Sequence, residues 1–273
     1  MMASRKSSVL SGLFAPKEVA LNRDTNLLKL IAMITMLMDH TGKMFFSRYQ
    51  IMPIFGRYQI MRIIGRMAFP IYAYCIAVGC VYSHDRLKYL SRIVLIGLIS
   101  QPFYAVALAH TTPRMYAINF VDNPVGAVVN FYVNSWKVPN IMYTLALGLL
   151  IIWTIRDRQF VFTAALALFV WLAKSSINYG WRGVALIVLF YLLIDRWWLS
   201  LPVVLAFMIW WGMDGSAYHM FGISFGIQMF AIMALPLIYI PTWSKLKINK
   251  WVYYLFYPAH LIAIMLIQFA LAA

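Results

Sequence analysis

Two neighbouring ionisable residues, Asp39 and His40, interrupt an apolar run that begins at Leu28. An ionisable side chain in a bilayer core costs about 3 kcal/mol even on insertion scales, so such residues are candidates for function. Histidine exchanges a proton near neutral pH, which makes His40 a candidate general base. Adjacent residues on a helix point about 100° apart, so we expect Asp39 to pair not with His40 but with Arg66 of the next apolar segment. Arg66 is then either a structural partner or a substrate ligand.

Further polar side chains interrupt other apolar segments and would reach the same outer layer of a helical bundle if successive segments alternate in direction. We predict catalytic roles for Asp39, His40, Arg66 and Tyr104, and substrate binding for Gln101, Asn140, Thr144, Tyr179, Arg182 and His260. For Tyr104, Asn140 and Thr144 the alternative is a hydrogen bond between helices, and for His260 it is a packing role.

The chemistry open to such a site is limited by the motifs that the sequence lacks. It has no GxSxG elbow, P-loop or HExxH motif, so serine-triad hydrolysis, ATP use and zinc chemistry have no motif behind them. Cys75 and Cys80 lie five residues apart and would point about 140° from each other on a helix, which disfavours a disulfide or a metal pair. We expect no metal. A histidine base could remove a proton from an amine or hydroxyl that then attacks an activated acyl group.

The composition excludes a water-soluble chain. Of the 273 residues, 63% are hydrophobic and 11% are charged, and the mean hydropathy is +0.77. We predict an all-α, polytopic integral membrane helical bundle with about nine transmembrane helices, eight or ten remaining open. Residues 1–26 form a basic tail with a possible interfacial helix, and 27–273 form one membrane-embedded domain. The expected spans are 28–46, 63–82, 92–110, 140–155, 159–174, 182–195, 197–213, 223–241 and 252–272.

The net charge of +15 reflects topology more than nucleic-acid binding, because Lys and Arg flank the apolar segments along the whole chain. With nine spans, a cytoplasmic N-terminus places the larger share of these residues inside. The chain is therefore expected to be a multi-pass protein of the bacterial cytoplasmic membrane. Lys43, Arg48, Arg57 and Arg62 depart from this rule, since they fall in the first outer connection, and we expect part of this group to face an anionic ligand.

The one long connection, 111–139, is too polar and too interrupted by proline and glycine to cross a membrane. Its aromatic residues suit a segment that lies against the membrane or caps a cavity. It resembles a lid or a re-entrant loop on the outer side.

Six segments, in order along nearly the whole chain, resemble the TraX family of membrane proteins linked to N-terminal acetylation of conjugative pilin. They are LKLIAMITMLMDHTG (28–42), RIIGRMAFPIYAYCIAVG (62–79), SQPFY (100–104), PNIMYTLALGLL (139–150), NYGWRGVALIVLFYL (178–192) and YYLFYPAHLIAI (253–264). The resemblance implies a membrane acyltransferase in which His40 is the essential histidine and cytoplasmic acetyl-CoA is the acyl donor. Arg86, Lys88 and Arg92 could then hold the CoA phosphates, although positive-inside flanking explains them equally well.

The expected partners are thus an acyl-CoA donor, the lipid bilayer and a peptide, saccharide or lipid acceptor. Two other functions stay open at this stage. One is a transporter or flippase of an anionic lipid or peptide, which the lack of an internal repeat disfavours. The other is a structural component of a secretion or pilus assembly, which would tolerate loss of His40.

Overall fold

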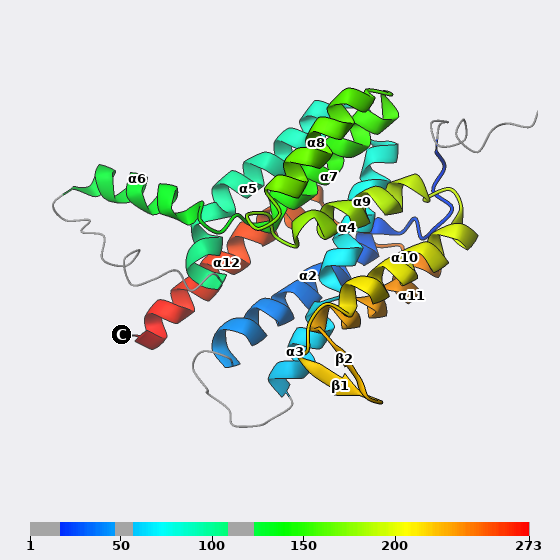
Figure 1. Cartoon of the computed structure of the whole chain (residues 1–273). Coiled ribbons are helices and arrows are strands. Elements are labelled where there is room, and N and C mark those ends of the chain that lie inside the picture. The colour runs from blue at the N-terminus through cyan, green and yellow to red at the C-terminus, as the bar shows by residue number, and fades with distance from the viewer. Residues whose placement is uncertain (1–16, 47–56, 109–122, 273) are drawn as a thin grey trace, which may run out of the picture.

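The computed structural model describes residues 17–46, 57–108 and 123–272, and this part of the chain is almost entirely helical (Figure 1). The α-helices are α2 (Thr25–Thr41), α3 (Arg57–Gly65), α4 (Ala68–Tyr82), α5 (Arg86–Leu108), α6 (Pro124–Ser135), α7 (Ile141–Arg156), α8 (Phe160–Leu172), α9 (Gly180–Leu192), α10 (Trp197–Gly212), α11 (Leu235–Tyr239) and α12 (Lys250–Ala272). A π-helical turn, η1 (Gly42–Phe46), continues α2, and a 3₁₀ helix, η3 (Ile227–Ala234), precedes α11.

Three helical stretches of the described chain are long and apolar enough to cross a membrane: Ile60–Tyr82, Arg86–Leu108 and Lys250–Leu271. Five shorter apolar helices accompany them. The prediction of an all-α chain with helices long and apolar enough to span a membrane is confirmed, whereas the number of nine spans stays a prediction. The exception to the helical fold is a small antiparallel hairpin of β1 (Tyr218–Met220) and β2 (Ile223–Phe225), in which His219 faces Ser224.

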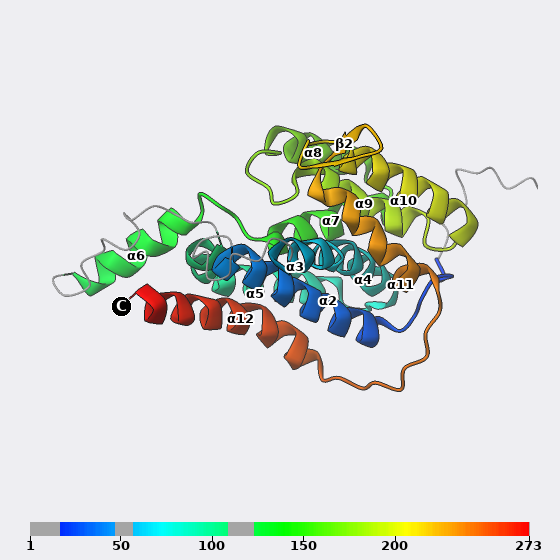
Figure 2. The same ribbon diagram turned by 90° about the horizontal axis from the view of Figure 1, so that it is seen from below.

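The core forms where α4 is enclosed by its neighbours α2, α7 and α9. Tyr74 of α4 packs edge-on against Phe190 of α9, with ring centroids 5.6 Å apart, and neither side chain is exposed. Gly148 of α7 lets α9 approach closely, because a Cβ there would lie 2.7 Å from Cδ1 of Ile187. Helix α12 lies outside this core, along α5 and α2 (Figure 2).

Several connections meet at one end of the bundle, which we call the basal end. There Lys17 binds Asp195 at 3.1 Å, the backbone N–H of Asn22 donates to the carbonyl of Ile238, and Ser244 N donates to Asp24. The hydroxyl of Tyr253 donates to the carbonyl of Asn26, so α12 and α2 begin side by side and run in the same direction. The opposite ends of these helices form the distal end of the bundle.

The predicted span 223–241 is wrong as a single helix. This stretch contains β2, η3 and α11 in succession. The N–H of Gly226 donates to the carbonyl of Gly212 at 2.8 Å, which ties the start of η3 to the end of α10, and Pro236 stands at the first turn of α11. A proline at that position starts a new helix more readily than it continues an old one.

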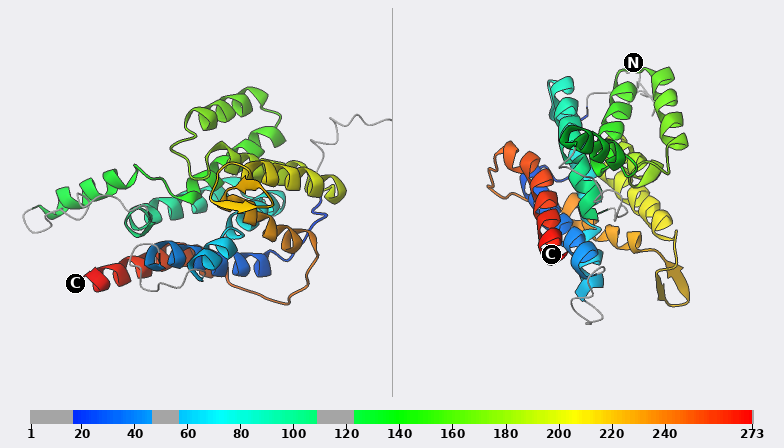
Figure 3. Two further views of the ribbon diagram at one scale, coloured as in Figure 1. Left: turned by 60° about the horizontal axis from the view of Figure 1, so that its bottom comes forward. Right: turned by 90° about the vertical axis from the view of Figure 1, so that its left-hand side faces the viewer.

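The expected loop 111–139 also needs correction, because 124–135 is a helix. Asn123 caps α6 by accepting a hydrogen bond from the N–H of Gly126 at 2.8 Å, and Pro124 follows in the first turn. The helix projects from the bundle (Figures 1 and 3) and leaves several valines exposed, among them Val125, Val128 and Val133. Residues 111–122 of this loop and 1–16 of the predicted tail lie outside the described residues.

The predicted division between the sixth and seventh apolar segments is confirmed, since Asp195 and Arg196 separate α9 from α10. The first segment ends its α-helix at Thr41 and continues as the π-helical turn η1. The second begins earlier than expected, because α3 and α4 follow each other with only two residues between them.

Candidate functional site

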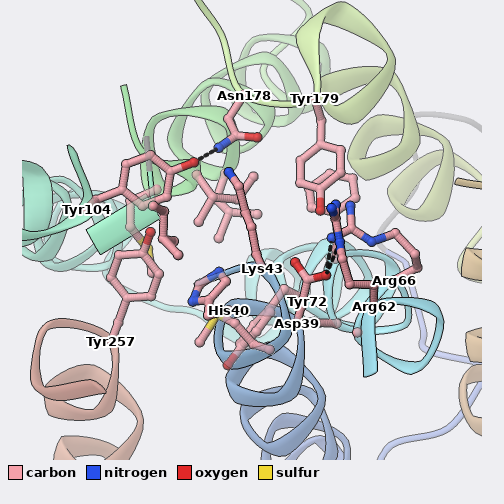
Figure 4. A pocket seen from close by; sticks show the side chains of 18 residues that line it. Asp39, His40, Lys43, Arg62, Arg66, Tyr72, Tyr104, Asn178, Tyr179 and Tyr257 are labelled. Atoms are coloured by element: carbon pink, nitrogen blue, oxygen red, sulfur yellow. Dashed lines mark hydrogen bonds and ion pairs between the residues drawn. The ribbon is translucent and has the colours of Figure 1, made fainter. Parts of the chain in front are cut away.

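A cavity of about 160 Å³ opens among α2, α3, α4, α5, α7 and α12, and polar side chains from most of these helices reach it (Figure 4). Eighteen residues line it: Met36, Asp39, His40, Lys43, Arg62, Gly65, Arg66, Ala68, Phe69, Tyr72, Tyr104, Leu108, Ile141, Met142, Leu145, Asn178, Tyr179 and Tyr257. The predicted catalytic residues Asp39, His40, Arg66 and Tyr104 are all among them, so the structure brings together side chains from three separate segments.

His40 is held by the second histidine of the site. Its Nδ1 lies 2.8 Å from Nε2 of His260, and the two rings meet edge to edge, nearly parallel at 16° with centroids 5.1 Å apart. The other nitrogen of His260, Nδ1, lies 2.8 Å from the carbonyl oxygen of Phe256. A carbonyl only accepts, so Nδ1 of His260 donates and its Nε2 accepts in the neutral ring. Nδ1 of His40 therefore carries the proton, and Nε2 of His40 keeps a lone pair for the cavity.

Asp39 makes the ion pair expected from the sequence. One of its oxygens binds Nη2 of Arg66, and the same oxygen lies 3.6 Å from Nε of Arg62. The side chains of Asp39 and Arg66 are only 13% and 10% exposed. Gly65 makes this contact possible, because a Cβ on it would lie 2.3 Å from Cβ of Asp39. The carboxylate thus joins α2 to α3 and sets two guanidinium groups beside the cavity.

Tyr104 faces His40 across the cavity in Figure 4. Its oxygen accepts a 2.6 Å hydrogen bond from Nδ2 of Asn178, so its own hydroxyl hydrogen can be donated elsewhere. The hydroxyl of Thr144 donates to the carbonyl of Asn178 at 2.7 Å and holds this residue in place. Thr144, predicted to bind substrate, therefore acts through Asn178, whose own role the sequence patterns did not single out.

Tyr179 lies directly before α9 with φ at 62°, a left-handed conformation that is uncommon for a bulky residue. It stacks on Phe69 with centroids 4.2 Å apart, and Gly183 leaves room for its Cβ. Burial raises the pKa of Tyr179, although the nearby Arg66 opposes the shift, and the phenol stays protonated at neutral pH. Such backbone strain is typical of positions held by surrounding structure at functional sites.

The family follows from a comparison with known proteins. The model of the family described as TraX protein matches residues 24–268, which is nearly the whole chain. The chain belongs to the TraX family. The matched region contains every residue described above for the cavity, from Met36 to Tyr257, and His260 as well.

This TraX chain also resembles a curated relative, the probable fimbrial assembly protein FimC, serogroup H1, of Dichelobacter nodosus. The two are 29% identical over 127 residues, which cover 45% of this chain and 43% of the relative. The chain thus matches less than half the length of this relative. No solved structure matches the TraX chain. The family and the three long apolar helices of the chain are typical of a membrane protein.

Two residues predicted to bind substrate, Gln101 and Asn140, do not line the cavity of the TraX chain. Nδ2 of Asn140 donates to the carbonyl of Gly97 at 2.7 Å and to Oε1 of Gln101 at 3.0 Å. Gln101 in turn donates to the carbonyls of Ser135 and Val138. This fully buried network joins α5 to the start of α7, where Asn140 is the N-cap. It agrees with the alternative of hydrogen bonding between helices.

Arg182 does not line this cavity either, but it lines a separate one that shares Tyr179 with it. It pairs with Asp214, and its guanidinium lies over the ring of Trp210 at 4.8 Å from the centroid. The residue lies at the distal end beside Trp181 and joins the start of α9 to the residues that follow α10, and its role in substrate binding stays a prediction.

The basic residues expected to hold CoA are largely paired. Arg86 forms two hydrogen bonds with Asp157, at 2.7 and 2.6 Å, and Lys88 binds Asp85 at 2.9 Å. Arg92 is partly buried on α5 and does not line the cavity. The Arg86 pair joins the α4–α5 connection to the α7–α8 connection, which is a structural role for this residue.

Two of the four basic residues in the first distal connection, Lys43 and Arg62, line the cavity. Arg57 begins α3, and Arg48 lies outside the described residues. Together with Arg66, three cationic side chains and one carboxylate surround the space, which gives it a net positive charge. In the described part of the chain no three His, Cys, Asp or Glu residues are grouped as metal ligands. The arrangement offers a histidine lone pair, a hydroxyl donor and cations around one small space.

Proposed function

We propose that the chain is a membrane-bound acyltransferase that moves an acetyl group from cytoplasmic acetyl-CoA to an amine or hydroxyl of an extracytoplasmic acceptor. The observation that carries the proposal is the His40–His260 pair, which leaves Nε2 of His40 as a base inside a polar cavity. A histidine oriented through its other nitrogen is the usual arrangement of a general base.

In the proposed reaction, Nε2 of His40 takes a proton from the acceptor as its nitrogen or oxygen attacks the thioester carbonyl carbon. The new bond joins the acceptor to the acyl carbon, and the carbonyl oxygen becomes negatively charged. When the intermediate collapses, the carbon–sulfur bond breaks and the protonated His40 returns its proton to the leaving thiolate. The products are the acetylated acceptor and free CoA thiol, and no further reactant is needed.

The charge on the carbonyl oxygen needs donors that are already in place. Tyr104 suits this role, because Asn178 occupies its oxygen as a donor and leaves the hydroxyl hydrogen for the cavity. Lys43 lies one helical turn beyond His40 and points into the same space (Figure 4). Asp39 does not take part in proton transfer in this mechanism, since Arg66 and Arg62 hold its carboxylate.

The size of the cavity favours a short acyl chain. The cavity has a volume of about 160 Å³ and is lined by polar and aromatic side chains. This space accommodates the thioester, an acetyl group and the terminal amine of an acceptor.

The proposed orientation places the basal end in the cytoplasm and the distal end outside, in a multi-pass arrangement in the bacterial cytoplasmic membrane with nine crossings. The basal end carries Lys17, Arg23, Arg86, Arg156 and Arg196, as the positive-inside rule requires. The eighth crossing would be made by η3 and α11 together, which is a short apolar stretch.

The acceptor that we propose is the N-terminus of a pilin or of another secreted peptide. The likeness to a fimbrial assembly protein supports this choice, as does the family's link to pilin acetylation. A terminal amine also fits the narrow cavity better than a bulky sugar or lipid would.

The test is acyl transfer by the purified protein in detergent, with labelled acetyl-CoA and peptides that carry a free or a blocked N-terminus. We expect label on the free peptide, none on the blocked one, and loss of transfer in His40→Ala. Transfer by His40→Ala at the rate of wild type would show that His40 is not the general base. Thermal stabilisation by CoA distinguishes the enzyme from a structural pilus component, because a ligand that binds the folded state raises the melting temperature.

A further inference from the structure

A second cavity, of about 130 Å³, lies next to the first towards the basal end of the bundle. Tyr72, Met142 and Leu145 line both cavities and so form part of the wall between them. The second cavity is mostly apolar but carries tyrosine hydroxyls, and two lysines, Lys29 and Lys250, also line it.

The two lysines lie at one level of the bundle. Helices α2 and α12 run in the same direction, and His40 and His260 meet across them. Lys29 is eleven residues before His40, and Lys250 is ten residues before His260. At a rise of about 1.5 Å per residue, both lysines therefore lie about 15 Å from the histidine pair along the helix axes.

Neither lysine forms a salt bridge with a carboxylate in the described part of the chain. The ammonium of Lys29 lies 5.4 Å from the ring centroid of Tyr253, and that of Lys250 lies 5.9 Å from the centroid of Trp251. Arg86 and Lys88, by contrast, are paired with Asp157 and Asp85. Among these basal cations, Lys29 and Lys250 thus line a cavity, and no carboxylate in the described part of the chain neutralises their charge.

We propose that the second cavity receives the phosphopantetheine arm of the acyl donor, with its phosphate between Lys29 and Lys250 and its thioester beyond Tyr72, beside His40. This inference rests on the proposed function. It replaces the earlier expectation that Arg86, Lys88 and Arg92 hold the donor's phosphates.

The length of the arm fits the distance. About twelve bonds separate its phosphate from its sulfur, which equals about four residues of extended chain and spans about 14 Å. Its two amides can bond to the hydroxyls of Tyr89, Tyr253 or Tyr254 along the cavity wall. The nucleotide part of the donor is too large for this cavity and stays outside, at the basal surface.

In this arrangement, the donor and the acceptor reach the site by separate routes. The donor enters through the second cavity from the basal end, and the acceptor reaches the first cavity from the distal end, where Lys43 and Arg62 lie. Tyr72 stands between the two routes and lines both. Its ring has to move when the thioester passes into the first cavity.

The experiment measures binding of CoA, 4′-phosphopantetheine and pantetheine to the full chain in detergent, for wild type, Lys29→Gln and Lys250→Gln. Lys245→Gln is the matched control, because this lysine is exposed in the same basal connection and lines neither cavity. We expect each cavity variant to weaken CoA and phosphopantetheine about tenfold and to leave pantetheine, which has no phosphate, unchanged. Ile96→Trp, which fills the cavity, should weaken all three ligands.

The outcomes separate this inference from the proposed function. If wild type transfers acetyl from CoA but Lys29→Gln and Lys250→Gln bind CoA as tightly as Lys245→Gln, the donor site is elsewhere and the enzyme function stands. If wild type binds no CoA in any form, the proposed donor is wrong and this inference fails with it.

Discussion

Nδ1 of His40 and Nε2 of His260 lie 2.8 Å apart, although 220 residues separate them in the chain. The carbonyl of Phe256 fixes the direction of this hydrogen bond, because it accepts from the other nitrogen of His260. His260, which the sequence suggested as a substrate ligand, is therefore a positioning residue for His40. The pair also joins the distal end of α2 to the middle of α12.

Replacing His260 should slow catalysis without weakening substrate binding. In His260→Ala the ring of His40 loses the acceptor that fixes its tautomer, and we expect kcat to fall about 10²-fold with KM nearly unchanged. His260→Gln keeps an acceptor oxygen and should recover part of the rate. His219→Ala is the control, since His219 lies in the exposed β-hairpin and bonds only Ser224. A fall in kcat that His260→Gln does not relieve would mean that His260 serves packing alone.

The hydroxyl of Tyr104 should act on the transition state. Tyr104→Phe keeps the ring and removes the donor together with the acceptor of the Asn178 amide, so kcat should fall about 10²-fold while the melting temperature falls only modestly. Steady-state transfer kinetics measure the first quantity and thermal unfolding the second. An unchanged kcat would assign the oxyanion to another donor, with Lys43 as the next candidate in the cavity.

The ion pair of Asp39 should be essential for stability. Asp39→Ala leaves Arg66 buried without its carboxylate, and we expect a loss of about 3–5 kcal/mol in unfolding free energy. The double variant Asp39→Ala with Arg66→Met removes the stranded charge and should recover part of the loss. Asp85→Ala is the comparison, because it removes an exposed pair with Lys88 and one capping hydrogen bond from the Lys88 N–H, which together should cost much less than loss of the buried pair. Equal stability of Asp39→Ala and wild type would contradict a buried pair.

Gly65 should tolerate no side chain. A Cβ there would lie 2.3 Å from Cβ and 2.8 Å from Cα of Asp39, so Gly65→Ala must push α3 away from α2. We expect a clear fall in melting temperature together with loss of transfer. Gly79→Ala is the matched control, because its Cβ would meet the hydroxyl end of the Tyr89 side chain, which can shift. If Gly65→Ala and Gly79→Ala have the same melting temperature, the close approach of α2 and α3 is not needed for the stability of the site.

The proposed orientation can be read from single cysteines in a background with Cys75 and Cys80 replaced by alanine. Lys174→Cys lies in the exposed α8–α9 connection at the distal end, and Lys245→Cys lies in the exposed connection before α12. A membrane-impermeant maleimide should label the first in intact cells and the second only after the membrane is opened. The reverse pattern would invert the chain in the membrane.

The sequence predicted most helices, because apolar runs of this length have few other structures open to them. It also predicted the Asp39–Arg66 pair, because two charges in adjacent apolar segments need each other. It did not predict the break in 223–241, where apolar composition alone could not reveal that Gly226 bonds back to Gly212.

The finer geometry of the site could not be read from residue types. Asn140 and Gln101 look like ligands in an apolar run, yet they satisfy each other and nearby carbonyls. Asn178 and Tyr257, which line the cavity, gave no sequence signal beyond their place in family segments. Which polar residues face a cavity depends on the rotation of each helix, and this is set by packing.

The most direct test of the proposed enzyme is mass spectrometry of a peptide with a free N-terminus after incubation with deuterated acetyl-CoA and purified protein. Wild type and His219→Ala should add the deuterated acetyl group to the peptide. His40→Ala should add it about 10²–10⁴-fold more slowly. Transfer by His40→Ala at the rate of wild type, or an unmodified peptide with wild type, would contradict acyl transfer by the His40–His260 pair.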